Sequence, residues 1–215
     1  MTNGDRMREI RTDYEAEGID VADVDPDPVV EFDAWFTGAI EAGVDQPNAF
    51  VLSTVGPNGR PSARTVLMKD FDGAGFVFFT NYQSRKSNEI DDNDAVSMLF
   101  LWLPLHRQIR IEGRATPVPA EESDDYFATR PPAARLGAHA SPQSREIASR
   151  HWLEARVAEL EVEFPDAAAP RPAHWGGFRV APDLFEFWQG RPSRLHDRVL
   201  YVPAEGGWKR SRLAP

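Results

Sequence analysis

Residues 49–81 read AFVLSTVGPNGRPSARTVLMKDFDGAGFVFFTN, and this stretch decides the fold class. Three runs rich in β-branched and aromatic residues, at 49–55, 62–69 and 75–81, are separated by the turn sequences GPNG and DFDG. Two further runs follow at 95–103 and 107–115, with only the short helical segment SRKSNEI inserted after the third. Strands at this spacing predict an antiparallel barrel or sandwich, because a parallel sheet would need longer helices between its strands.

Helical patterns flank these strands. From Pro28 to Gly43, apolar residues recur every three or four positions and predict a helix with one apolar face, made of Val29, Phe32, Trp35, Phe36 and Ile40. A second helix is predicted over 119–129. Ser141-Pro142 is typical of the N-cap and first position of a third helix, which would end at Pro165. Its apolar side would present Ile147, Leu153, Val157, Leu160 and Phe164.

The C-terminal portion is again rich in β-type runs, namely GGFRVAP, DLFEFWQG, RLHDRVLYVP and GWKRSRL. Residues 1–27 are polar and acidic and have too few large apolar side chains for a core of their own. We therefore predict a mainly β protein with helices (α+β), organised as a single domain over 28–215 that follows a flexible N-terminal arm, 1–27.

Charge is distributed unevenly along the 215 residues. Asp and Glu number 34 against 24 Lys and Arg, a net charge of -10, and residues 1–50 hold 13 of the acids and 3 of the bases. An acidic chain without a basic tract predicts no nucleic-acid partner. The absence of cysteine excludes disulfides and thiolate metal sites, and no apolar run reaches the roughly 20 residues that span a membrane. We expect a cytoplasmic protein with no membrane partner.

Two of the three lysines lie in small cationic clusters. Lys69 follows Arg64 on the second predicted strand, and Arg85-Lys86 follows Ser84 at the start of a short helix, where free amide groups favour an anion. A solvated surface pair is the alternative interpretation of Arg85-Lys86. In a regular strand Arg64 and Lys69 would point to opposite faces, about 17 Å apart, so they are not expected to bind one phosphate together.

The run Arg194-Leu195-His196-Asp197-Arg198 is the sharpest local signal. At strand periodicity Arg194, His196 and Arg198 share one face, where they repel one another unless water or an anion faces them. An exposed sheet face is the alternative. The neighbouring charges favour the neutral form of His196, which suits hydrogen bonding.

Flat aromatic side chains stand near both cationic regions, among them Trp188 and Phe79, and they suit either a planar phosphorylated cofactor or an ordinary core. The sequence contains no GxGxxG, P-loop, HExxH or GxSxG motif, and the other histidines are scattered. We therefore predict no metal site and no nucleophilic hydrolysis.

Nine runs in this chain, in their order, resemble the FMN-dependent pyridoxine/pyridoxamine 5′-phosphate oxidases. They are RTVLMK (64–69), FFTNYQSRK (78–86), RQIRIEG (107–113), YFATRP (126–131), SPQS (141–144), WGGFRV (175–180), EFWQG (186–190), RLHDR (194–198) and RLAP (212–215). The resemblance covers nearly the whole chain. It implies an FMN-binding split β-barrel, Greek-key-like and flanked by helices, and a homodimer with FMN at the subunit interface.

The resemblance also implies roles for individual residues. Implied FMN contacts are Arg64, Thr65, Val66, Leu67, Met68, Lys69, Phe79, Thr80, Arg85, Lys86, Gln108, Gln143, Ser144, Trp188 and Arg198. Lys69, Tyr126 and Arg130 would hold the substrate phosphate, and the catalytic pair Arg194 and His196 would contact the pyridine ring. Arg11 and Tyr14 would belong to an arm that closes over the substrate.

The implied reaction is the oxidation of pyridoxamine or pyridoxine 5′-phosphate by O2 to pyridoxal 5′-phosphate, with release of hydrogen peroxide. Two alternatives stay open: a flavin oxidase of a larger ring, as in phenazine biosynthesis, and a flavin- or pyridoxal-phosphate-binding protein without turnover. The chain departs from the family at Ala134, where a phosphate-binding Ser is common. The loss of that hydroxyl would cost ~1–3 kcal/mol of binding if nothing replaced it.

Overall fold

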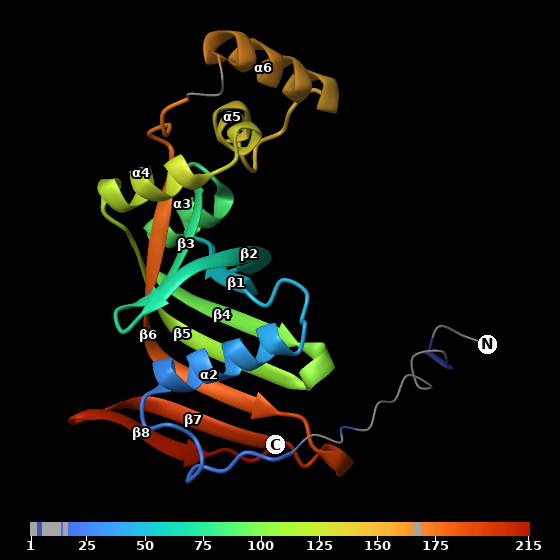
Figure 1. The fold of residues 1–215 in the computed structure, drawn as a ribbon, viewed down its shortest axis with the longest axis vertical. Coiled ribbons are helices and arrows are strands. Elements are labelled where there is room, and N and C mark those ends of the chain that lie inside the picture. The colour runs from blue at the N-terminus through green and yellow to red at the C-terminus, as the bar shows by residue number, and fades with distance from the viewer. Residues whose placement is uncertain (1–3, 6–13, 15–16, 166–168) are drawn as a thin grey trace. The chain divides into compact units, whose positions relative to one another are not determined.

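The framework of the protein is an eight-stranded sheet, labelled in Figure 1. The computed structural model describes residues 4–5, 14, 17–165 and 169–215. In these ranges the strands are hydrogen-bonded in the order β3-β2-β1-β4-β5-β6-β7-β8, and β3 also pairs with β6, which closes the first six into an antiparallel barrel. The predicted fold class is confirmed. The bounds are β1 Ala49–Val55, β2 Pro61–Asp72, β3 Gly75–Asn81, β4 Ala95–Trp102, β5 Arg107–Pro117, β6 Trp175–Gln189, β7 Asp197–Ala204 and β8 Gly207–Arg212.

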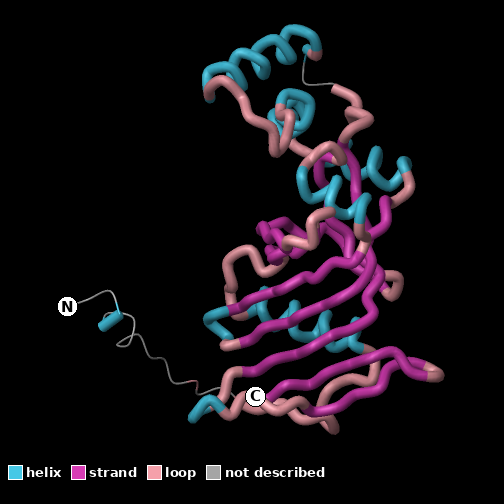
Figure 2. Tube along the Cα trace, turned by 180° about the vertical axis from the view of Figure 1, so that it is seen from behind, coloured by secondary structure: helices cyan, strands magenta, loops and turns pink. Residues whose placement is uncertain are grey.

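Short helices interrupt and flank the strands, which run alongside one another in Figure 2. None of the helices in the described ranges is both long and apolar enough to cross a membrane. The α-helices are α2 Pro28–Glu41, α3 Arg85–Asp92, α4 Ala120–Thr129, α5 Pro132–Ala140 and α6 Arg150–Glu163, and the 3-10 helices are η1 Leu103–Leu105 and η3 Pro192–Arg194.

Contacts cluster the chain into two compact units. Residues 1–47, 99–111 and 183–215 form the first unit, and residues 48–98 and 112–182 form the second. Strands β4, β5 and β6 each contribute one part to each unit.

Helix α2 builds one side of the core of the first unit. Asp27 caps it by accepting from the Val29 amide, and Pro28 occupies the first turn, where no amide donor is needed. Trp35 packs edge-on against Phe187, with ring centroids 5.2 Å apart. Ile40, expected on the apolar face, is 54% exposed, whereas Ala39 is fully buried. The buried face of α2 therefore includes Ala39 instead of Ile40, the residue predicted there.

Part of the predicted arm is docked on the first unit. Val24 is buried, and its carbonyl accepts from Arg210 Nη1 at 2.6 Å. The Tyr201 hydroxyl donates to the carbonyl of Asp25 at 2.8 Å, and Arg212 bonds the carboxylate of Asp20 at 2.7 Å. Residues 20–25 are thus fixed through both backbone and side-chain groups.

The second unit has an aromatic core between β1, β3 and β6. Phe78 packs against Phe50 and Phe178, with centroid separations of 6.0 and 5.7 Å. Gly75 opens β3 with φ +133°, and a Cβ there would lie 2.1 Å from the carbonyl oxygen of Val180. Glycine therefore permits the close approach of β3 to β6 that closes the barrel.

Two predicted boundaries are wrong. The third predicted helix, α6, begins after Ser149, whose hydroxyl accepts from the Trp152 amide, whereas Ser141 follows the last turn of α5. Ile147 consequently lies in a loop and is 40% exposed. Strand β7 starts only at Asp197, because Ser193 and Arg194 take left-handed backbone angles, φ +58° and +63°. A left-handed backbone cannot continue a strand.

Candidate functional site

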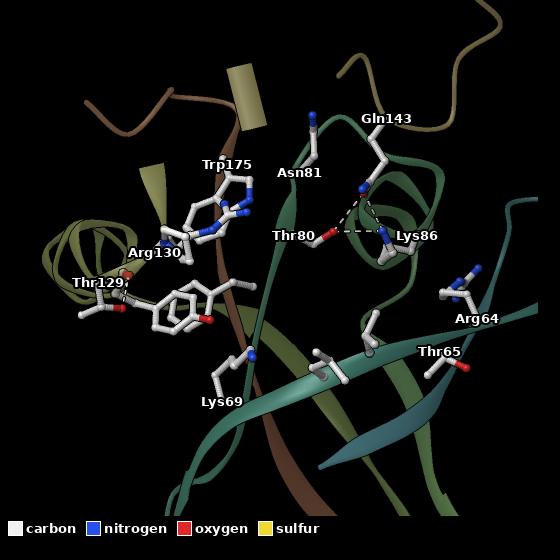
Figure 3. A pocket seen from close by; sticks show the side chains of 15 residues that line it. Arg64, Thr65, Lys69, Thr80, Asn81, Lys86, Thr129, Arg130, Gln143 and Trp175 are labelled. Carbon is white, nitrogen blue, oxygen red and sulfur yellow. Dashed lines mark hydrogen bonds between the residues drawn. The ribbon is translucent and has the colours of Figure 1, made fainter. Parts of the chain in front are cut away.

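A cavity of about 550 Å³ lies in the second unit, between β2, β3, α4 and Lys86 of α3 (Figure 3). Many of the sequence-predicted site residues line it together. They are Arg64, Thr65, Val66, Leu67, Lys69, Phe79, Thr80, Lys86, Tyr126, Arg130 and Gln143. Asn81, Thr129, Pro131 and Trp175 complete the lining.

Lys86 occupies one end of this cavity and is 9% exposed. Its ammonium donates to Gln143 Oε1 at 2.7 Å, to Thr80 Oγ1 at 2.9 Å and to Ser84 Oγ at 3.3 Å. No carboxylate in the described residues pairs with it. Burial, assisted by the charge of Arg64, lowers the pKa of Lys86 from 10.5 to about 8. A buried cation that has only neutral oxygen partners is prepared to receive an anion.

A buried carboxylate, Glu89, binds Arg64 of this cavity and also Arg85 of α3. Glu89 Oε1 accepts from Arg85 Nε at 2.8 Å, and its Oε2 lies 3.2 Å from Arg64 Nη2. The hydroxyls of Ser62 and Thr54 also donate to Oε2, each at 2.5 Å. Burial alone would raise the pKa of Glu89, but these hydrogen bonds lower it from 4.5 to about 2. Glu89 thus stays ionised and holds the Arg64 guanidinium in place.

The opposite end of the cavity carries a second cationic group (Figure 3). The Arg130 guanidinium lies 4.6 Å from the Trp175 ring centroid, and its Nη1 is buried without a partner in the described part of the chain. Burial lowers the pKa of Arg130. The rings of Phe79, Tyr126 and Trp175 lie nearly parallel to one another, with centroids of Phe79 4.0 Å from Tyr126 and 5.5 Å from Trp175. An unpartnered buried guanidinium nitrogen marks a binding position for an anion.

The expectation that Arg64 and Lys69 face apart needs a correction. Pairing between β2 and β3 shifts register between Met68 and Asp70, so Lys69 is the extra residue of a β-bulge. Regular alternation ends there, and both cations line the same cavity, at its two ends. They therefore face different parts of one elongated ligand space.

Three predicted FMN contacts of the second unit lie outside the cavity lining. Met68 is buried in the core, 4% exposed. Arg85 and Ser144 line a neighbouring cavity of about 450 Å³, which also includes Gln143. Ser144 takes a left-handed backbone angle, φ +69°. Gln143 belongs to both linings, so the two cavities share one side chain.

The other predicted residues belong to the first unit, where several rings gather. Tyr14 packs edge-on against His196, with centroids 5.5 Å apart, and Trp188 lies 4.6 Å from the same imidazole. Gln108 is half-buried on β5, and Arg11 falls outside the described residues. The unit thus brings Tyr14, Trp188 and His196 together.

The predicted single face of Arg194, His196 and Arg198 is wrong, because only Arg198 lies within β7. Arg194 ends η3 and is exposed. His196 Nδ1 accepts from the Arg191 amide at 3.1 Å, which places the proton of the neutral ring on Nε2. Burial, and next the charge of Arg194, lower the pKa of His196, in the direction predicted from the sequence.

Arg198 is held by a buried carboxylate of its own. Glu186, 3% exposed, accepts from Arg198 Nε and from Arg110 Nη2, each at 2.7 Å. Burial would raise the pKa of Glu186, but the two guanidinium groups lower it. Arg198 is thereby oriented by Glu186.

Sequence reasoning missed Glu89, Glu186 and Trp175. Glu89 stands four residues after Arg85 on a helix, a spacing that places the two side chains on one face. Glu186 and Arg198 are cross-strand neighbours two positions out of register, since Trp188 pairs with Arg198 and Glu186 with Leu200. These signals become specific only when the fold is known.

Comparisons with known proteins show the family. Residues 36–163 match the family model described as pyridoxamine 5′-phosphate oxidase, and residues 175–215 match the C-terminal dimerisation region of pyridoxine 5′-phosphate oxidase. A pyridoxine/pyridoxamine 5′-phosphate oxidase of Rubrobacter xylanophilus is 54% identical over 96% of this chain and 95% of its own. One from Burkholderia mallei is 52% identical over 97% and 99%.

Solved structures show the same fold. PhzG from Burkholderia lata, in complex with tetrahydrophenazine-1-carboxylic acid, superposes with a TM-score of 0.88 at 31% identity, covering 95% of this chain and 100% of that one. A pyridoxamine 5′-phosphate oxidase-related, FMN-binding protein from Nostoc punctiforme has a TM-score of 0.68 at 20% identity, over 85% of this chain and 96% of its own. With two family models along its length and relatives above 50% identity, the chain belongs to the pyridoxine/pyridoxamine 5′-phosphate oxidase family, whose cofactor is FMN.

Proposed function

We propose that this chain is an FMN-dependent oxidase in vitamin B6 metabolism. It converts pyridoxamine 5′-phosphate, pyridoxine 5′-phosphate or both into pyridoxal 5′-phosphate, with O2 as oxidant and hydrogen peroxide as co-product. One observation carries the proposal: the cavity has separate cationic ends, Arg64 with Lys86 and Lys69 with Arg130. Two phosphorylated ligands, the cofactor and the substrate, would satisfy both ends.

The residues at the first end fit FMN. Lys86 and Arg64 would hold its phosphate, because the ammonium of Lys86 has only neutral partners in the described chain. Residues 65–67 of β2 would border its ring, since they line the cavity between the two ends. When bound, FMN supplies a two-electron oxidation of the substrate C4′ carbon, with O2 as final electron acceptor.

The second end would hold the substrate phosphate. Arg130 Nη1 would gain the partner that it lacks among the described residues, and the Lys69 ammonium and the Tyr126 hydroxyl are the other donors there. Trp175 restrains the Arg130 guanidinium from one face, so less side-chain freedom is lost on binding.

Arg194 and His196 would contact the pyridine end of the substrate, where the reaction takes place, and would orient and polarise it. His196, neutral with its proton on Nε2, would donate a hydrogen bond there. Trp188 and Arg198 would contact FMN. These four residues lie within the match to the family's dimerisation region. We infer a homodimer in which this region of one subunit completes the FMN site of the other.

The structural likeness to PhzG keeps a phenazine-type oxidase as the second candidate. The experiment that decides is hydrogen peroxide release by the purified yellow protein. Pyridoxamine 5′-phosphate, pyridoxine 5′-phosphate and tetrahydrophenazine-1-carboxylic acid would be compared as substrates. Turnover of either vitamin compound supports the proposal. Turnover of the phenazine alone supports the second candidate, and bound FMN without any turnover indicates a binding protein.

The affinity for FMN is expected to fall with rising pH because of Lys86. Its ammonium binds phosphate, and in the free protein it loses its proton at a pKa of about 8. Above pH 8 the Kd for FMN should therefore increase, by up to about tenfold per pH unit. Fluorescence titration of the apoprotein with FMN between pH 7 and 9.5 measures this. Lys86→Met should bind weakly at every pH, and an equal pH dependence in this variant would contradict the assignment.

Arg194→Asn is expected to lower kcat/KM at least about 30-fold with little change in FMN affinity, since Arg194 would contact only the substrate. Asn is chosen because Arg194 has φ +63°, a conformation that Asn tolerates better than Ala. Steady-state kinetics and FMN titration measure the two effects. An unchanged kcat/KM would remove Arg194 from the site.

A further inference from the structure

His106 has an unusual and firmly held backbone. It follows η1 with φ +51°, in the left-handed region that non-glycine residues seldom adopt. Its carbonyl accepts from the Gly190 amide at 2.8 Å and from Gln189 Nε2 at 3.1 Å. These bonds join the turn after η1 to the end of β6, so the imidazole projects from a fixed point.

The Tyr14 ring lies in a small site made of His106, Trp188, Gly190 and His196, called the seat below. The imidazole of His106 forms one wall of this seat. The ring centroids of Tyr14 and His106 are 4.5 Å apart, closer than those of Tyr14 with His196, 5.5 Å, or with Trp188, 6.0 Å. Gly190 forms the floor, where a Cβ would lie 2.9 Å from both Tyr14 Cγ and His106 Cβ. All five residues belong to the first unit.

We propose that His106 is a positioning residue that holds the Tyr14 ring against His196 and thereby sets where Tyr14 lies beside the substrate. His196 and Trp188 also contact each other, with ring centroids 4.6 Å apart, and they form the back of the seat. His106 comes from a different segment, the turn after η1. Its centroid distance to Tyr14 is the shortest of the three ring contacts. The role in catalysis rests on the proposed function; the seat itself does not.

Fluorine NMR tests the seat without any turnover. The chain has 4 tyrosines, so 3-fluorotyrosine labelling gives few signals, and Tyr14→Phe identifies that of Tyr14. In the wild-type holoenzyme this signal should be displaced from its position in denatured protein by the surrounding rings. His106→Asn removes the ring and tolerates the left-handed backbone, and it should move the signal to the denatured position. His106→Phe should keep it displaced, as should the control His151→Asn on the exposed face of α6.

Kinetics test the consequence. His106→Asn should raise KM for pyridoxamine 5′-phosphate about three- to tenfold, the range that loss of an aromatic contact gives, with a smaller change in kcat. In a Tyr14→Ala background the same substitution should change KM no further, because His106 acts through Tyr14. KM effects that multiply, or a Tyr14 signal that stays displaced in His106→Asn, would overturn the proposal. If the wild type oxidises neither vitamin phosphate, the proposed function fails, and the fluorine result still decides the seat.

Discussion

Arg130→Met is expected to raise KM for pyridoxamine 5′-phosphate at least about 100-fold while FMN remains bound. The guanidinium is confined over Trp175, and its buried Nη1 has no partner in the described chain until an anion arrives. A hydrogen bond to a charged group contributes about 1.5–3 kcal/mol, and a guanidinium can make two of them to one phosphate. Removing both accounts for a factor of about 100 or more.

A comparison with pyridoxamine, the same compound without its phosphate group, makes this test specific. Pyridoxamine cannot use Arg130, so wild type and Arg130→Met should oxidise it equally poorly, and the variant should lose its preference for the phosphorylated compound. Arg114→Met is a matched control, because Arg114 is an exposed arginine paired with Asp94 on the surface. Retained discrimination between pyridoxamine and its phosphate in Arg130→Met would show that the substrate phosphate binds elsewhere.

Glu89→Ala is expected to lower the free energy of unfolding by about 3–5 kcal/mol, the usual effect of removing one partner of a buried ion pair. Glu89 is 4% exposed, and the loss of its carboxylate removes one acceptor each from Arg64, Ser62 and Thr54. Urea unfolding at pH 7 measures the change. Glu159→Ala, which removes an exposed carboxylate paired with Arg156, should cost only about 0–1 kcal/mol.

Lowering the pH should remove the difference in the free energy of unfolding between wild type and Glu89→Ala. The folded-state pKa of Glu89 is lowered from 4.5 to about 2, so its stabilising contribution is complete above pH 4.5 and is lost as pH falls towards 2. Wild type and Glu89→Ala should therefore converge in stability between pH 4.5 and 2.5. An equal gap at pH 7 and pH 3 would show that Glu89 acts through packing and not as an ionised acceptor.

The strands were predictable because their signals are local. β1 at 49–55 and β3 at 75–81 match the predicted runs residue for residue, since turn residues bound each run on the chain itself. Ser141 and Ser149 carry the same capping chemistry, and sequence alone favoured the wrong one. The choice depends on where α5 ends, and α5 itself, a nine-residue helix that begins at the second of two prolines, was not predicted.

The candidate site was predictable as a set of cations and aromatics, but not as a geometry. The bulge at Lys69 arises from pairing with β3, and the left-handed turn at Arg194 joins η3 to β7. Glu89 accepts a hydrogen bond from Thr54, which lies 35 residues earlier in the chain, and no local sequence pattern predicts this pair. Hydrogen bonds and ion pairs between residues far apart in the sequence could therefore be identified only from the folded structure.

Among the described residues, β8 stands last in the strand order and pairs with β7 on one side only, so it forms an edge of the sheet. An open edge presents unpaired amides and carbonyls that can recruit another chain into an aggregate. β8 is six residues long and includes Lys209 and Arg210, and Arg210 bonds a neutral carbonyl, so the positive charges of two such edges brought together would repel each other. The arginine that binds the carbonyl of Val24 thus also disfavours the pairing of β8 with a further strand of the same kind.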